Sequence, residues 1–254
     1  MTRLLSSVEG TLPQELFVDL CGADVLKLAP HAPAEQEAPI PDLADLFARA
    51  ARLGFFGGTV AEPWGAVAEV LASEVRLVER RASFRLRLDA IDPGALRVLW
   101  NVLGARDLEE ASMRTVPKVP GKQGALLDPG HLAYPGLHRP LPFALEAEPP
   151  ARSSRERAVQ LVFQRPPPDE VVDEVLAALG VFTELLLLGG YPEDGQDPRD
   201  SGAFPDPAFQ LDEVTVEQAF PELFAADQAA FHAVVNHAMT LDRRGHPLSV
   251  VVVR

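Results

Sequence analysis

The chain has 254 residues, with 23 Lys and Arg against 37 Asp and Glu, and a formal net charge of −14. Its composition, 47% hydrophobic and 24% charged, is typical of a globular protein, and its length suits one large domain or two small ones. Because nucleic-acid phosphates and anionic lipid headgroups are negative, this charge argues against nucleic-acid binding and against docking on a membrane.

The cysteine content and the apolar stretches predict a cytoplasmic protein. The one cysteine, Cys21, excludes an intrachain disulfide and a cysteine-rich zinc site, and we expect it to be a small buried residue. The first residues lack the apolar run of about 7–15 residues that marks a signal peptide. No stretch approaches the ~20 apolar residues of a membrane span. Arginine greatly outnumbers lysine, which indicates GC-rich coding and a bacterial source.

The first half of the chain predicts helices alternating with strands. In chain order we expect strands at 16–20 and 24–29, a helix at 42–53 capped by Asp42 and ended by Gly54, a strand at 55–60, a short helix at 63–72, extended structure at 74–91 and a helix at 93–103. Within the extended stretch Phe84, Leu86 and Leu88 alternate with polar residues, which predicts one buried and one wet face.

The second half predicts a more regular unit. We expect a strand at 157–165, a helix at 169–179 ended by Gly180, a strand at 181–188, a strand at 210–219, a helix at 225–240 and a strand at 248–253. The stretch 181–188 is short, apolar and bounded by glycines, so we interpret it as a central strand buried on both faces.

These elements predict an α+β fold. The order βαββαβ of residues 157–254 is that of a ferredoxin-like unit with both helices on one face of the sheet. Residues 1–106 form a looser α/β half of similar order, which is compatible with a divergent internal duplication. Residues 107–156 form a connecting region rich in proline and glycine, in which 143–148 is one strand candidate. The halves either share one sheet or pack face to face.

A long acidic loop follows Gly189 and is the first candidate site. Its carboxylates suit a basic protein partner; they are Glu193, Asp194, Asp197, Asp200 and Asp206. Their order does not match the calcium-binding loop of an EF-hand, so we expect no metal there. No cofactor is expected either, because the glycines near residue 57 follow a predicted helix instead of leading from a strand into one.

A second candidate site combines a loop with basic side chains of a predicted strand. The residues are Asp128, His131, Tyr134, His138, Arg85 and Arg87. Histidine and aspartate can serve acid–base chemistry, and arginine grips carboxylates and phosphates. His232 and His237 are five residues apart on a predicted helix, so they do not share a face, and we expect His237 to point away from the apolar stripe.

Two functional hypotheses remain. The first is a non-enzymatic acidic protein that captures a basic protein partner, as an immunity protein does with a toxin; it is favoured because no serine-nucleophile, metal or paired-carboxylate signature is found. The alternative is an enzyme or small-ligand-binding protein with its site between the two halves, formed by the loop at 128–138 and the neighbouring arginines.

Overall fold

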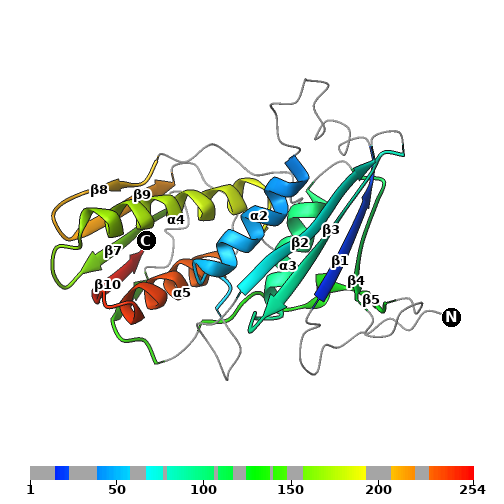
Figure 1. Ribbon diagram of the computed structural model, residues 1–254. Coiled ribbons are helices and arrows are strands. Elements are labelled where there is room, and N and C mark those ends of the chain that lie inside the picture. The colour runs from blue at the N-terminus through cyan, green and yellow to red at the C-terminus, as the bar shows by residue number, and fades with distance from the viewer. Residues whose placement is uncertain are drawn as a thin grey trace, which may run out of the picture.

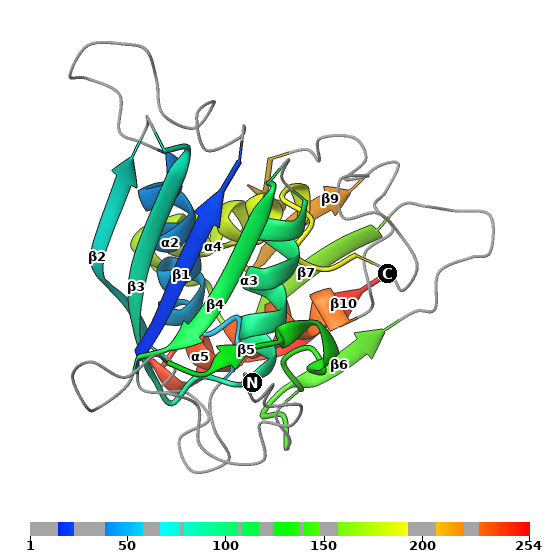
Figure 2. The same cartoon turned by 90° about the vertical axis from the view of Figure 1, so that its right-hand side faces the viewer.

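Four layers form the molecule: a sheet, two layers of helices, and a second sheet (Figures 1 and 2). The computed structural model describes residues 15–22, 39–57, 67–76, 79–105, 108–116, 124–137, 140–147, 157–192, 207–220 and 229–254. Within these ranges the chain forms two five-stranded sheets, here called sheet A and sheet B. The helices lie between the sheets, so each sheet has one face toward the helices and one outer face.

Sheet A is antiparallel throughout and has the strand order β2-β3-β1-β4-β5. Its strands are β1 (Glu15–Cys21), β2 (Val67–Arg76), β3 (Arg81–Asp89), β4 (Glu110–Thr115) and β5 (Leu126–Leu127). In β1 the even-numbered residues are buried and the odd-numbered ones face outward, as period-2 alternation requires. The same alternation in β3 buries Phe84, Leu86 and Leu88.

Sheet B has the strand order β6-β10-β7-β9-β8 and is antiparallel except for the parallel pair of β6 and β10. Its strands are β6 (Ala144–Ala147), β7 (Arg157–Phe163), β8 (Phe209–Gln210), β9 (Thr215–Phe220) and β10 (Leu248–Val253). Val159, Leu161 and Val251 point toward the helices and are fully buried. The inner face of sheet B is therefore apolar and forms part of the hydrophobic core.

The helices join the two sheets through one continuous core. They are α2 (Pro39–Arg52), α3 (Gly94–Gly104), α4 (Asp169–Leu187) and α5 (Ala229–Arg243). Helix α2 packs on β2 and β3, α4 and α5 pack on sheet B, and α2 contacts α4 across the middle of the molecule. Phe55, which follows α2, lies 6.0 Å from Phe182 of α4, ring centroid to ring centroid. Large apolar side chains from both halves therefore share the interior.

The two sheets are assembled in the same sequence of elements. The first half runs β1, α2, β2, β3, α3, β4, and the second runs β7, α4, β8, β9, α5, β10. If β1 to β4 are numbered 1 to 4 in the first half, and β7 to β10 are numbered 1 to 4 in the second, the spatial order is 2-3-1-4 in sheet A and 4-1-3-2 in sheet B. The second order is the first one counted from the opposite edge of the sheet. The fold is mixed α+β, as the sequence predicts.

Several expected elements are confirmed, and others have a different secondary structure from the one expected. The strands at 16–20 and 248–253 and the helix at 93–103 are present, and the strand expected at 157–165 runs from Arg157 to Phe163. Residues 181–187 are helical and continue α4, so the predicted central strand at 181–188 is wrong, and Gly180 lies inside the helix instead of ending it. The strand that follows α4 in the chain is instead the short β8, which lies at the edge of sheet B and not at its centre.

Smaller corrections have local causes. Helix α2 begins at Pro39, before Asp42, because proline suits a first helical turn that needs no N–H. Residues 53–56 turn instead of extending, since Gly54 and Gly57 both have positive φ. Residues 67–72 are part of β2, not of a helix, because pairing with β3 overrides their weak helical pattern.

The remaining corrections concern turns and exposure. The predicted strand at 210–219 is interrupted by a turn in which Asp212 accepts hydrogen bonds from the Val214 amide and the Thr215 hydroxyl. Cys21 is partly exposed, because β1 places it on the outer face. Strands β4 and β5 lie in the region expected to be irregular. The expected strand at 24–29 lies outside the described residues.

Candidate functional site

The outer face of sheet A carries a row of four side chains that none of the described helices covers. Phe17 of β1 lies directly opposite Arg85 of β3 and Arg114 of β4, and Ala72 of β2 lies opposite Arg85. We call Ala72, Arg85, Phe17 and Arg114 the Phe17 row. Phe17 is 37% exposed, although its chain neighbours Leu16 and Val18 are buried. A large apolar side chain therefore stands on a face that carries mainly polar and charged residues, with Val67 of β2 as another exposed apolar side chain.

Ion pairs between strands neutralise most of the arginines on this face. The guanidinium of Arg87 lies 2.9 Å from the carboxylate of Glu69, and that of Arg81 lies 3.2 Å from Asp19. Arg85 donates to Glu15. Exposed pairs of this kind contribute about 0–1 kcal/mol each, so their main effect is to cancel charge. The basic patch predicted from the sequence is thus largely balanced.

Arg76 and Glu74 extend this network along β2. The Nε of Arg76 donates to Glu74 at 2.8 Å, and this hydrogen bond lowers the pKa of the Glu74 carboxyl. Arg114 differs from the other arginines of the face: no ion pair or hydrogen bond joins its side chain to any residue in the described ranges. Its two diagonal neighbours on β1, Glu15 and Asp19, are already engaged by Arg85 and Arg81.

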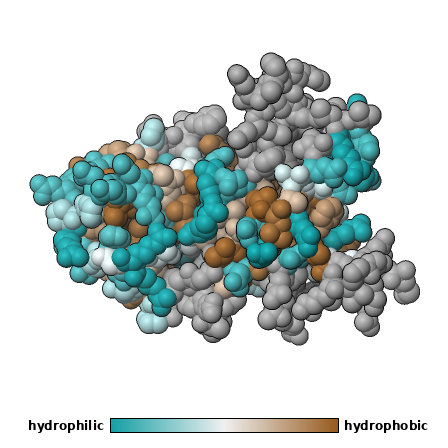
Figure 3. Space-filling model, in the orientation of Figure 1, coloured by the Kyte–Doolittle hydropathy of each residue, from teal (hydrophilic) through white to brown (hydrophobic). Residues whose placement is uncertain are grey.

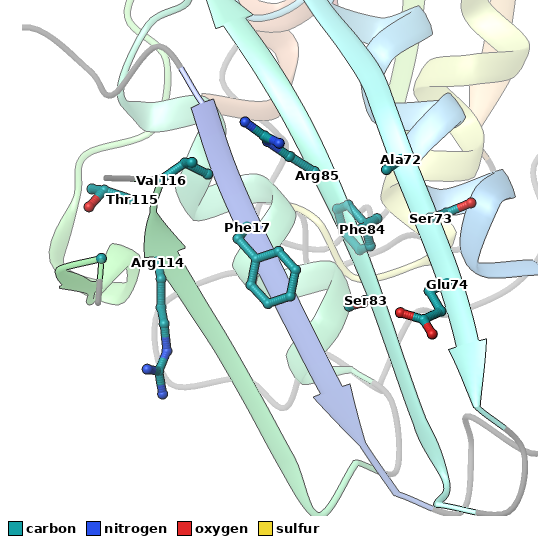
Figure 4. A pocket seen from close by; sticks show the side chains of 11 residues that line it. Phe17, Ala72, Ser73, Glu74, Ser83, Phe84, Arg85, Arg114, Thr115 and Val116 are labelled. Carbon is teal, nitrogen blue, oxygen red and sulfur yellow. The ribbon is translucent and has the colours of Figure 1, made fainter. Parts of the chain in front are cut away.

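The Phe17 row crosses a hollow of about 720 Å³ (Figure 4). In the close view Phe17 lies between Arg85 and Arg114, and Glu74 points toward the hollow from β2. Ser83 adds a hydroxyl group to the lining, to which Ser73 and Thr115 also belong. A smaller hollow of about 350 Å³ shares Phe17, Glu74 and Ser83 and continues toward Arg81. The volume is in the range of pockets that hold small ligands.

The loop that the sequence nominated lies elsewhere in the molecule. Asp128 accepts from the amide of Gly130, and the Nε2 of His131 lies 3.4 Å from its other carboxylate oxygen. His131 is 83% exposed in its side chain, so this contact is open to water. The Tyr134 ring lies under the Arg97 guanidinium of α3, 4.0 Å from it. These contacts fix the loop against α3.

The structure does not bring the six residues of this second candidate site together. Arg85 and Arg87 point outward from sheet A, whereas Tyr134 packs on α3 and bonds to Asn101 and Pro192 on the inner side. His138 lies outside the described residues, as do the acidic-loop positions Glu193, Asp194, Asp197, Asp200 and Asp206. The sequence analysis did not identify Phe17 and Arg114 as candidate site residues. The signal for Phe17 was its odd-numbered place between two buried residues.

His237 lies in the core, so the expectation that it points away from the apolar stripe is wrong. Its side chain is 1% exposed and its ring centroid lies 5.1 Å from that of Phe55. The reason is that the turn after α2, with Leu53 and Phe55, covers the face of α5 that an isolated helix would expose to water. Burial lowers the pKa of His237 to about 4, so its ring is neutral near pH 7.

The described side chains offer no grouping suited to a metal ion, since no three His, Cys, Asp or Glu residues among them are placed to hold one. No helix in the described ranges has the length and apolar character needed to span a membrane. No protein-family model matches the chain, and no curated protein matches it in sequence.

Proposed function

We propose that the protein is a non-enzymatic, acidic cytoplasmic binding protein that captures a basic protein partner, as an immunity protein captures a toxin. The observation that carries the proposal is the net charge of −14 together with the pairing on sheet A. Because the arginines of sheet A are largely neutralised by neighbouring carboxylates, the acidic excess is presented elsewhere on the surface.

One end of the α4 layer presents such an excess within the described ranges. Five exposed carboxylates lie at the start of α4 and in the β8–β9 turn, none in an ion pair with a described residue: Asp169, Glu170, Asp173, Asp212 and Glu213. The same end carries Arg165, Arg243 and Arg244, and Arg244 pairs with Glu174. Figure 3 shows a mainly hydrophilic surface at this end, on its left. Such a surface steers a basic partner by long-range attraction.

The alternative of an enzyme or small-ligand protein with its site at the 128–138 loop has less support. Its arginines, Arg85 and Arg87, lie on the outer face of sheet A and are engaged by Glu15 and Glu69. Tyr134 is packed against α3 on the other side. A site that needs all of these residues would have to span the sheet.

We also propose that the two halves are ferredoxin-like units derived by internal duplication. The support is the shared element order and the shared strand order, with the first copy extending through β4 and the second running from 157 to 254. A duplicated scaffold of this kind offers two outer sheet faces and several loop clusters for contacts with partners.

A pull-down from lysate at two salt concentrations tests the capture function. We expect a basic protein to be retained at about 0.05 M salt and released at about 0.5 M, since screening weakens attraction between exposed charges. The double variant Asp173→Lys/Glu213→Lys should lose that protein. The control Asp89→Lys/Glu146→Lys makes the same change in net charge at exposed sites away from this end and should retain it. Absence of any basic protein at both salt concentrations would overturn the proposal.

A further inference from the structure

The guanidinium of Arg114, which is not paired with any described residue, lies beside an exposed aromatic ring in a hollow of ligand size. The cross-strand register places Arg114 directly opposite Phe17, and Phe17 directly opposite Arg85. The hollow of about 720 Å³ extends from Arg114 across Phe17 to Ala72 and Ser73 of β2. We propose that this hollow binds a small organic carboxylate, with the carboxylate paired to Arg114 and a ring-sized apolar body packed on Phe17.

The distribution of charge on sheet A selects the sign of the ligand. Glu15 and Asp19, the only acidic residues diagonal to Arg114 on β1, are held by Arg85 and Arg81. Arg114 therefore has no described carboxylate left to neutralise it, although the molecule as a whole is strongly acidic. A guanidinium binds a carboxylate through two parallel N–H···O bonds, so a carboxylate is the chemistry that fits this position.

The position of Glu74 sets the orientation of the ligand. Glu74 lines the hollow on the β2 side and is paired with Arg76, so that side offers no free positive charge. The carboxylate is therefore directed toward β4, and the apolar body extends over Phe17 toward Ala72. Phe17 and Ala72 give this part of the lining its apolar character, whereas the Phe84 side chain is buried on the inner face of the sheet. The inference concerns the outer face of sheet A and is independent of the acidic end proposed to capture a partner.

Titration of the full-length protein with defined probes, followed by NMR, tests the proposal. The probes are 3-phenylpropionate, its neutral amide 3-phenylpropionamide, and acetate, which lacks the apolar body. We expect 3-phenylpropionate to bind about fivefold more tightly than either other probe, since an exposed carboxylate–guanidinium pair contributes up to about 1 kcal/mol and the apolar contact with Phe17 contributes a similar amount. The shifts should map to β1, β3 and β4.

Variants on the same face supply matched controls. Arg114→Gln and Phe17→Ser should each weaken the binding of 3-phenylpropionate about fivefold, and Arg114→Lys should retain part of the affinity because the charge stays. Arg87→Gln removes an arginine of the same face that is paired with Glu69 and does not line the hollow, and it should leave binding unchanged. Thermal unfolding of each variant separates loss of binding from loss of fold.

Three results would overturn the proposal. The first is an absence of saturable shifts up to about 10 mM probe. The second is equal affinity for the acid and the amide, or for wild type and folded Arg114→Gln. The third separates two sources of a carboxylate: if acetyl-Gly-Gly-Phe with a free C-terminus binds at least about tenfold more tightly than 3-phenylpropionate, the hollow recognises peptide C-termini instead of small acids.

Discussion

The Nδ1 atom of His237 donates a hydrogen bond to the backbone carbonyl oxygen of Leu53, at 2.7 Å. A carbonyl can only accept, so the proton is on Nδ1 and the ring is the neutral tautomer. Its Nε2 is buried and has no partner among the described residues. The contact joins α5 to the turn after α2, which connects the helices of the two halves through one buried side chain.

The free energy of unfolding should decrease as the pH is lowered from about 6.5 to about 4, because of His237. Its pKa is lowered from 6.5 to about 4 in the folded state, chiefly by burial. In that window the unfolded chain binds a proton that the folded chain does not, so acidification favours unfolding. A shift of this size corresponds to a loss on the order of 3 kcal/mol, complete near the folded pKa.

Urea unfolding of wild type and His237→Gln at several pH values measures this contribution. Glutamine can keep a hydrogen bond to Leu53 but cannot titrate, so the variant should show a shallower dependence on pH from 6.5 to 4. At pH 7 it should be less stable than wild type, because it does not fill the space beside Phe55. Equal pH slopes for the two proteins would show that His237 is not the titrating group.

Gly54 should tolerate no side chain, because two constraints act on it together. Its φ is +83°, and an added Cβ would lie 2.1 Å from Oγ1 of Thr240. We expect Gly54→Ala to lower the free energy of unfolding by at least about 2 kcal/mol, from backbone strain and from displacement of α5. Chemical denaturation gives the value.

Two further variants separate the causes. Thr240→Ala removes the hydroxyl, so the double variant Gly54→Ala/Thr240→Ala should recover part of the loss while the strain at φ remains. Gly104→Ala is the matched control: it lies at the end of α3 with no atom within 4 Å of the added Cβ, and it should be neutral or slightly stabilising. If Gly54→Ala proved as mild as Gly104→Ala, the close approach to Thr240 would be wrong.

The misassigned stretch 181–188 shows what the sequence could not decide. A short apolar run between glycines is compatible with a buried strand and equally with a buried stretch of helix. Its buried residues Val181, Phe182, Leu185 and Leu186 follow a helical spacing, but the four leucines in a row hide that period. Burial of this end of α4 against α2 and α5, which selects the helix, is a tertiary contact with no local signal.

Helical continuity at Gly180 can be tested directly. Gly180 is exposed and an added Cβ would meet no atom within 4 Å. Gly180→Ala should therefore stabilise the protein by about 0.5–1 kcal/mol, because alanine is the better helix former. Gly180→Pro should destabilise it by about 3 kcal/mol or more, since proline breaks the helix. A boundary between helix and strand at this position would predict that alanine is the harmful change.

The sequence predicts which arginines lie on the exposed face of the strand, but it does not predict which carboxylates pair with them. Alternation along 83–89 is enough by itself to place Arg85 and Arg87 on a wet face. Their partners Glu15 and Glu69 are 70 and 18 residues distant in the chain. Only the register of β1, β2 and β3 decides which carboxylate pairs with which arginine. With this register, Arg114 of β4 is paired with no carboxylate of the described residues. Strand register is set by long-range packing, so it could not be predicted from a single sequence.

Two neighbouring tyrosines should respond oppositely to loss of their hydroxyl groups. The Tyr134 hydroxyl donates to the Pro192 carbonyl at 3.1 Å and accepts from Asn101 at 3.0 Å. The Tyr191 hydroxyl, whose ring lies 5.3 Å from that of Tyr134, is buried with no partner in the described part of the chain. Burial also raises the pKa of Tyr191, so it stays neutral. Urea unfolding should show Tyr134→Phe less stable by about 1–2 kcal/mol and Tyr191→Phe unchanged or more stable, because removal of an unsatisfied buried hydroxyl leaves no group unpaired. A loss for Tyr191→Phe as large as that for Tyr134→Phe would mean that a buried water or another group satisfies the Tyr191 hydroxyl.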